Sequence, residues 1–185
     1  LHRVDRRQRQ MCIRDRICSG SFEWRAMDNV TVRAAGSHDL PALAALWHER
    51  MTLLLQFDRR FALAPDAREQ WAEAAARWLA TPECLIVAAE RKADAALVGY
   101  AIGWIERAPL GLLPAQMGCI SDMHIAAHSH QSGLGRRLLD SLRTWFRQKG
   151  VESLTIRAAR RLPVEQAFWR ALGATEWVDV MWMKL

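Results

Sequence analysis

The sequence predicts one domain with a mixed α/β (α+β) sheet, and three observations lead to that fold class. Apolar residues follow the period of a strand in some segments and the period of a helix in others. Two helical segments precede a run of three strands, and helices and strands alternate afterwards, so a fully parallel sheet is excluded. The 185 residues are 51% hydrophobic and 25% charged, which is typical of a globular chain with a sizeable core.

The first part of the domain is predicted to hold one strand and two helices. Residues 29–34 alternate as in a short strand. Ser37 or Asp39 can cap a helix whose apolar residues keep helical spacing over residues 40–54. A second helix is expected over about residues 65–80, where a Thr-Pro pair ends it.

Three strands are then predicted in quick succession. Residues 84–89 and 95–106 are apolar segments joined by the polar turn 91–94, which indicates a hairpin, and residues 116–126 form the third strand. The remaining predicted elements are a helix over about 133–149 with Gly150 after its end, a strand over 152–158, a helix over 163–172 stopped by Gly173, and a final strand over 176–185.

The distribution of charge excludes two broad classes of partner. The chain has 26 Lys and Arg residues against 20 Asp and Glu residues. Seven of the arginines and only three of the acids lie in residues 1–26, which leaves 19 basic and 17 acidic residues in the remainder. Because the remainder is nearly neutral, we expect neither nucleic acid nor a membrane surface as a partner. No apolar run approaches the roughly 20 residues of a membrane span.

Residues 1–26 are interpreted as an N-terminal extension, either disordered or an artefact of gene prediction, ahead of a domain at residues 27–185. The stretch is rich in arginine and lacks the apolar core of a secretory signal. Met27 is the expected natural start of translation. A transit peptide or an arm that binds nucleic acid stays open as an alternative for this stretch.

The cysteines and histidines of the domain show no metal-ligand pattern. Cys84 and Cys119 each stand alone in an apolar strand, which predicts two buried thiols and favours a reducing cytoplasm. His124, His128 and His130 lie close together in the sequence, but no Cys or carboxylate stands at ligand spacing from them. We therefore expect no metal.

A glycine turn after the strand at 116–126 is the strongest functional signal. The residues His130-Gln131-Ser132-Gly133-Leu134-Gly135-Arg136 lead directly into an amphipathic helix. The free N–H groups and partial positive charge of a helix start form a site for phosphate or pyrophosphate. Arg136-Arg137 stands where a P-loop has Lys-Ser/Thr, and Leu138 stands where a dinucleotide fold has a third small residue, so both nucleotide motifs are excluded.

These residues resemble the GNAT acyltransferase superfamily, whose signature is Arg/Gln-x-x-Gly-x-Gly/Ala between the fourth strand and the third helix. The signature positions here run from His130 to Gly135. The strand pattern of residues 120–125 and the segment Ala167–Gly173 are also similar to the family. The resemblance covers Met27 to Leu185. It implies a mostly antiparallel central sheet, with parallel strands four and five splayed around a CoA site, and about four flanking helices.

The resemblance implies an N-acyltransferase that moves an acetyl group from acetyl-CoA to a primary amine of a small molecule or a protein, by direct attack in a ternary complex. A non-catalytic GNAT-like domain that binds CoA as a sensor or interaction module is the alternative, and a homodimer stays open. The implied donor contacts are His130, Gln131, Ser132, Gly133, Leu134, Gly135 and Arg136 at the pyrophosphate, and Met123, His124 and Ile125 along the pantetheine.

Three positions depart from the family pattern. His130 stands at the first position of the signature, where Arg or Gln is usual. Trp169 stands where many members have a tyrosine that protonates the leaving thiolate, and an indole cannot act as an acid at neutral pH. Leu162 replaces a frequent asparagine before the last helix.

The proton chemistry and the acceptor site are predicted from carboxylates and aromatic rings. Asp122 is the predicted general base, with His124 as the second candidate, and a backbone or arginine partner is the alternative role of the Asp122 carboxylate. Tryptophans at helical spacing more often pack in a core than bind a ligand. The expected acceptor contacts are Phe57, Asp58, Phe61 and Trp104, with Trp71, Trp177 and Asp179 as further candidates.

Overall fold

The computed structural model describes residues 29–129 and 133–184. The predicted N-terminal extension and three predicted donor contacts, His130, Gln131 and Ser132, lie outside the described residues. The strands are β1 (Val30–Ala34), β2 (Cys84–Arg91), β3 (Leu97–Arg107), β4 (Gln116–Ile125) and β5 (Leu154–Ile156). The helices are α3 (Leu40–Phe57), α4 (Ala67–Leu79), α5 (Leu134–Gln148) and α6 (Pro163–Ala171), with short 3₁₀ turns at Ser37–Asp39 and Ala127–Ser129.

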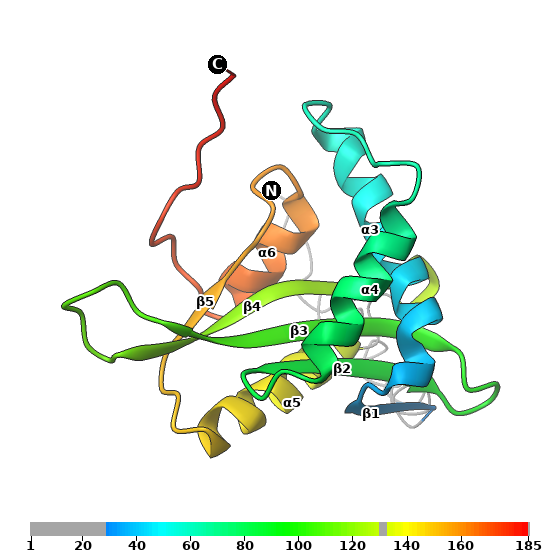
Figure 1. Cartoon of the computed structure of the whole chain (residues 1–185), viewed down its shortest axis with the longest axis horizontal. Coiled ribbons are helices and arrows are strands. Elements are labelled where there is room, and N and C mark those ends of the chain that lie inside the picture. The colour runs from blue at the N-terminus through cyan, green and yellow to red at the C-terminus, as the bar shows by residue number, and fades with distance from the viewer. Residues whose placement is uncertain (1–28, 130–132, 185) are drawn as a thin grey trace, which may run out of the picture.

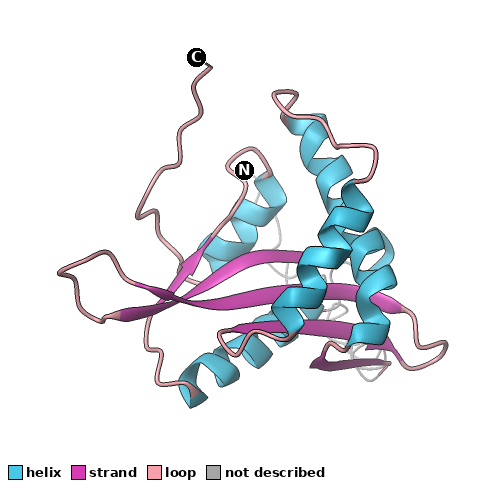
Figure 2. Ribbon diagram, viewed as in Figure 1, coloured by secondary structure: helices cyan, strands magenta, loops and turns pink. Residues whose placement is uncertain are grey.

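The strands form one sheet in the order β1-β2-β3-β4-β5 (Figure 1). The pairs β1–β2, β2–β3 and β3–β4 are antiparallel, and β4–β5 is parallel. Helices α3 and α4 pack on one face, and α5 packs on the other (Figure 2). The mixed sheet, the β2–β3 hairpin and the parallel last pair confirm the predicted fold class.

The parallel pair is short, and this opens the sheet. The register of β4 with β5 covers only Gly118–Ile120 against Leu154–Ile156, and the Arg157 N–H donates to the Ile120 carbonyl at 3.0 Å. Strand β4 continues to Ile125 beside β3. The two parallel strands therefore separate after Ile120, as expected for the splayed strands four and five that the resemblance implies.

A β-bulge in β4 lies at this same point. Gly103 of β3 faces Ile120 and the adjacent Ile102 faces Asp122, so Ser121 is an extra residue in β4. Simple alternation would place Ile120 and Asp122 on one face of the sheet. The bulge instead leaves Ile120 in the core under α5 and turns Asp122 toward α3.

Each face of the sheet has its own hydrophobic core. On the α5 face, the apolar stripe of the helix is buried, namely Leu134, Leu138, Leu142 and Phe146. Gly103 and Gly118 leave room for the Phe146 ring, since a Cβ on Gly118 would lie 2.9 Å from Phe146 Cε1. On the other face, neighbouring aromatic rings pack between the helices and the sheet, with centroids 5.7 Å apart for Trp47–Trp71 and 5.9 Å for Trp71–Trp78. Most of the helical tryptophans thus pack in the core, as expected.

The predicted final strand at 176–185 is wrong for the residues that the structure describes, because residues 174–184 form no ladder with the sheet. Apolar alternation indicates that a segment can form a strand, but no strand of the described sheet pairs with this one. Arg160 binds Asp179 at 2.6 Å, and the Phe61 and Trp182 rings meet edge to face with centroids 6.2 Å apart. The segment therefore leaves the sheet as an extended tail (Figure 1). The strand predicted over 152–158 is also shorter, since only Leu154–Ile156 pair.

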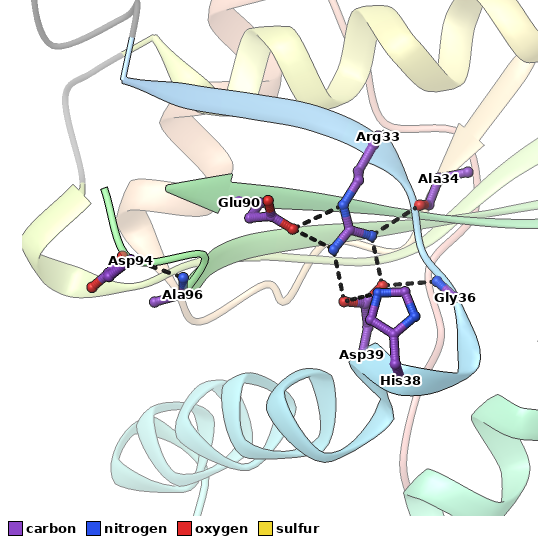
Figure 3. A network of polar contacts seen from close by, with 8 residues as sticks. All are labelled: Arg33, Ala34, Gly36, His38, Asp39, Glu90, Asp94 and Ala96. Atoms are coloured by element: carbon purple, nitrogen blue, oxygen red, sulfur yellow. Dashed lines mark hydrogen bonds and ion pairs between the residues drawn. The ribbon is translucent and has the colours of Figure 1, made fainter. Parts of the chain in front are cut away.

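A buried carboxylate ties β1, β2 and the start of α3 together (Figure 3). Asp39 is 4% exposed and accepts hydrogen bonds from the Arg33 guanidinium at 2.7 and 2.9 Å and from the Gly36 N–H at 2.8 Å. Arg33 Nε also donates to Glu90 at 2.9 Å. The Arg33 hydrogen bonds lower the pKa of Asp39, so this carboxylate is ionised in the folded protein at neutral pH.

We predict that Asp39→Asn lowers the free energy of unfolding by about 1–3 kcal/mol, because Arg33 loses a buried charged partner. The folded-state pKa of Asp39 lies below the value of about 3.9 for an unfolded Asp. Its contribution to stability is therefore complete above about pH 4 and is lost as the pH falls through the folded-state pKa. Urea unfolding from neutral to acidic pH measures both effects.

The matched control is Asp140→Asn, which removes a carboxylate that is 60% exposed. Its ion pair with Arg143 is long, at 3.5 Å. The control should keep the wild-type stability and its steep loss in acid, whereas Asp39→Asn should have a shallower loss. Equal acid dependence in Asp39→Asn and wild type would contradict the role given to Asp39.

Candidate active site

The start of α5 lies next to the opening between β4 and β5. Gly133 has φ +69° and ψ 4°, a left-handed conformation that side chains other than glycine rarely adopt, and it directly precedes the helix. Gly135 lies in the first turn, where a Cβ would meet the Phe168 ring at 3.2 Å and Ile125 Cδ1 at 3.3 Å. These two glycines fix how the helix N-terminus meets β4 and α6, and the first N–H groups of the helix have no partner within it.

The predicted donor contacts divide between two faces of β4. Met123 and Ile125 pack against the core under α5, next to Leu134. Arg136 is exposed at the first turn of α5, whereas the Arg137 guanidinium donates to the Val30 carbonyl at 2.8 Å. The arrangement brings Met123, Ile125, Gly133, Leu134, Gly135 and Arg136 to one region.

His124 points to the opposite face from Met123 and Ile125. It is 9% exposed, and its Nε2 lies 3.4 Å from Glu49 Oε1 without the geometry of a hydrogen bond. Burial lowers the pKa of His124, so the imidazole is neutral at pH 7. The side chain thus faces α3 rather than the start of α5.

Asp122, the predicted base, has both carboxylate oxygens occupied. Arg50 Nε donates to Oδ1, and the Tyr100 hydroxyl donates to Oδ2 at 2.8 Å. Tyr100 is fully buried, and burial together with the Asp122 charge raises its pKa well above the usual value, so it stays protonated. The arginine partner that the sequence left open as the alternative role of Asp122 is present in the structure.

Arg50 joins Asp122 to a second carboxylate on α6. Its guanidinium nitrogens lie 3.2 and 3.4 Å from the two oxygens of Glu165, and its side chain is only 9% exposed. Burial lowers the pKa of Arg50, but the charges of Asp122 and Glu165 outweigh it and raise the pKa above the usual value. We call Arg50, Asp122, Glu165 and Tyr100 the Arg50 cluster.

Arg50, Tyr100 and Glu165 were not predicted as site residues from the sequence. One signal for Arg50 was present, because it stands four residues from both Leu46 and Leu54 on the apolar face of the predicted helix. A charged residue on such a face needs a buried partner. No local pattern says which carboxylate pairs with it, since Asp122 and Glu165 are 72 and 115 residues away.

Trp169 stands at the position where a tyrosine acid was expected. It is 5% exposed within the core under α5, and its Nε1 has no hydrogen-bond partner among the described residues. An indole N–H can only donate a hydrogen bond. A buried donor without a partner is uncommon, and it indicates that a ligand atom or water accepts from it.

The acceptor candidates do not all lie together. Asp58 and Phe61 line a cavity of about 190 Å³ between the end of α3 and the connector to α4, together with Met51, Leu54, Leu55, Ala62 and Leu63. Phe57 is half exposed at the last turn of α3. The Arg60 hydrogen bond lowers the pKa of Asp58 to about 2, so this carboxylate stays charged.

The other aromatic candidates lie elsewhere. Trp104 packs edge to face on Trp78 with centroids 5.8 Å apart, and Trp71 is buried beneath α3. Trp177 is 59% exposed on the C-terminal tail. The structure therefore brings Asp58 and Phe61 to one cavity. Trp177 lines a larger groove that also includes Asp58, whereas Trp71 and Trp104 belong to the core beneath α3 and α4.

Residues 29–129 and 133–184 contain neither a metal-ligand cluster nor a helix suited to cross a membrane. No group of three or more His, Cys, Asp or Glu side chains in these ranges could hold a metal ion. None of the helices in these ranges combines the length and apolarity that a membrane crossing requires.

The two cysteines of the domain are shielded from solvent to different degrees. Cys119 is buried and Cys84 is half-buried, and burial raises the pKa of Cys84 to about 12.

Comparison with known proteins identifies one family. The model of the acetyltransferase (GNAT) family matches residues 46–174 of the chain. A search of curated proteins found no match.

Solved structures of the same fold are distant in sequence. An aminoglycoside antibiotic 6'-N-acetyltransferase of Acinetobacter baumannii aligns with a TM-score of 0.67 and 15% identity over 84% of this chain and 97% of its own. An aminoglycoside N-acetyltransferase in complex with CoA aligns with a TM-score of 0.64 and 16% identity, over 84% of this chain and 94% of its own. A ribosomal-protein-alanine N-acetyltransferase of Brucella melitensis biovar Abortus 2308 aligns with a TM-score of 0.63 and 15% identity, over 84% of this chain and 99% of its own.

We predict that Arg50→Met destabilises the protein by about 3–5 kcal/mol, because it leaves two buried carboxylates without their cation. The double variant Arg50→Met/Glu165→Gln removes one of those charges and should recover part of the loss. Thermal and urea unfolding of the three proteins measure the difference. Equal stability of wild type and Arg50→Met would show that the Arg50 cluster does not contribute to folding.

Proposed function

The chain belongs to the acetyltransferase (GNAT) family, and on that premise we propose that it transfers an acetyl group from acetyl-CoA to a primary amine of a small molecule or a protein. The observation that supports this most is the parting of β4 and β5 after Ile120, beside a helix that begins at a left-handed glycine. That arrangement offers an extended cleft next to an anion site.

Features of the donor side fit acetyl-CoA. The pyrophosphate is proposed to lie at the start of α5, where Gly133 places no side chain and Arg136 is exposed. The pantetheine is proposed to run along Met123, His124 and Ile125, on the side of β4 that β5 leaves. The orphaned Trp169 N–H can donate to an oxygen or sulfur atom of the donor. His130, Gln131 and Ser132 stay predicted contacts.

The proposed reaction is direct attack in a ternary complex. The amine nitrogen attacks the thioester carbonyl carbon, an oxyanion forms and is stabilised by backbone N–H groups, and the carbon–sulfur bond breaks. The thiolate gains a proton and the amide nitrogen loses one, so an ammonium acceptor and acetyl-CoA give the amide, free CoA and one proton. Trp169 supplies a hydrogen bond at this stage and no proton.

The acceptor is proposed to be an amine that arrives as a cation. Asp58 is ionised and lines one cavity with Phe61, and the Arg60 guanidinium that pairs with Asp58 lies 5.8 Å from the centroid of the Phe61 ring. This region therefore accommodates a cation between a carboxylate and an aromatic face. The names of the structural relatives include both aminoglycoside and ribosomal-protein-alanine acetyltransferases, so both small and protein amines belong in the test. The non-catalytic alternative, a CoA sensor, is favoured by the absence of an acid at Trp169.

We predict that the purified protein releases free thiol from acetyl-CoA when an amine is present. The panel should contain sisomicin, spermidine, phenylethylamine and a peptide with N-terminal alanine, and mass spectrometry should show an acetylated product. CoA binding without turnover of any of these amines would support the sensor. Absence of both CoA binding and turnover would overturn both functions.

We predict that Gly133→Val abolishes CoA binding, because a β-branched side chain cannot readily keep φ at +69° and would project toward the phosphates. Isothermal titration calorimetry with CoA measures this. Gly150→Val is the matched control: Gly150 has φ +74° at the other end of α5, with open space around its Cβ position.

Both variants should lose a similar amount of stability, about 1–2 kcal/mol, from the left-handed conformation. Only Gly133→Val should lose CoA. Wild-type affinity in Gly133→Val would contradict the proposed position of the pyrophosphate.

A further inference from the structure

The Arg50 cluster lies across the opening of the sheet. Asp122 is on β4 just beyond the last residue that pairs with β5, and Glu165 is on α6, the helix that follows β5 in the chain. Arg50 reaches both carboxylates from α3. The two carboxylates therefore come from the two sides of the opening and meet on one guanidinium.

The two carboxylates of the cluster differ in how fully they are used. Asp122 has a donor on each oxygen, Arg50 Nε and the Tyr100 hydroxyl. Glu165 has the longer contacts of 3.2 and 3.4 Å to Arg50 and a hydrogen bond from the Ala159 backbone N–H, and its side chain keeps 16% of its surface exposed. A carboxylate oxygen can accept more than one hydrogen bond, so Glu165 has capacity left for another donor.

The charges around Glu165 do not balance. Arg50 supplies one positive charge against the two negative charges of Asp122 and Glu165. Tyr100 of the cluster and His124 of β4 are neutral at pH 7, because burial shifts both pKa values away from their charged forms. Glu49 of α3, whose Oε1 lies 3.4 Å from His124 Nε2, is a further carboxylate and adds no positive charge. An ammonium group would neutralise the remaining negative charge, whereas a second carboxylate would add to it.

We propose that Glu165 holds the ammonium group of the acceptor and takes a proton from it, a role that rests on the proposed acetyl transfer. One N–H bond of the ammonium breaks, its electron pair stays on nitrogen, and the proton moves to a Glu165 oxygen. The neutral amine then attacks the thioester carbonyl carbon, the carbon–sulfur bond breaks, and a second proton passes from the nitrogen to the CoA thiolate as the amide forms. Glu165 returns its proton to solvent, so the products are the amide, free CoA and one proton. Asp122 positions Arg50 through its two hydrogen bonds and does not touch the acceptor.

The surroundings of Glu165 suit a base. Burial raises the pKa of Glu165, and this outweighs the lowering effects of the Arg50 charge and the Ala159 backbone N–H. A carboxylate whose pKa is moved toward neutrality is a stronger base.

The test compares Glu165→Gln with Asp122→Asn, which remove the same charge from the same cluster. Each leaves Arg50 with one carboxylate, so both variants should fold, and unfolding midpoints and CoA affinity check this. The kcat/KM for each active amine of the panel is then measured as a function of pH. Glu165→Gln should lower kcat/KM by about 10²- to 10⁴-fold near neutral pH.

The pH profile separates proton transfer from a merely structural role. In Glu165→Gln, kcat/KM should keep rising with pH until the amine itself is deprotonated in solution, because only free amine can then react. Asp122→Asn should keep the wild-type shape of the profile, with an ascending limb set by Glu165. Glu165→Asp should restore part of the rate, and its kcat/KM should again level off with rising pH as in the wild type.

Each outcome decides between the proposals. If wild type acetylates an amine and Glu165→Gln keeps the wild-type profile, the role of Glu165 is overturned and the acetyltransferase function stands. If Asp122→Asn alone loses the ascending limb, Asp122 is the base, as the sequence predicts. If wild type acetylates no amine, the proposed function fails, and the role of Glu165 fails with it.

Discussion

The pairing of β4 with β5 over Gly118–Ile120 and no further is the constraint on which the candidate site depends. A parallel strand that stopped pairing so early would normally leave polar backbone groups of its neighbour without partners. Here the opening lies directly before helix α5, whose N-terminal N–H groups also need partners. The edge of β4 that β5 leaves and the first turn of α5 thus lie at one opening, and a long polar ligand with a phosphate at one end suits both.

The Arg50 cluster is not explained by stability alone. Moving a guanidinium and two carboxylates out of water costs several kcal/mol for each ion, and well-packed apolar residues of similar volume often stabilise a fold as much or more. The cluster already borders apolar side chains of the core, since Trp71 packs next to Tyr100 with ring centroids 6.1 Å apart. Charges retained in this place are better explained by chemistry at the opening of the sheet than by the folding of α3.

Much of the fold follows from local patterns, and the parts that do not are long-range. The stripe Leu134, Leu138, Leu142 and Phe146 predicts α5 from spacing alone, and the positive φ of Gly150 and Gly173 agrees with their expected places after α5 and α6. The final strand was wrong because alternation says that a segment can form a strand but not that an edge will receive it. Arg50, Tyr100 and Glu165 were missed because their partners are distant in sequence.

The β-bulge at Ser121 determines which side chains of β4 face α3 and which lie under α5. If β4 alternated regularly through Ser121, Asp122 would share the face of Ile120 and point into the core under α5. With the bulge, Asp122 and His124 point toward α3, while Met123 and Ile125 stay under α5. One strand can then present its free edge beside α5 and hold Arg50 through Asp122 on its other side. The start of α5 was predictable because a glycine motif encodes backbone geometry, whereas the direction of Asp122 depends on a bulge that alternation does not predict.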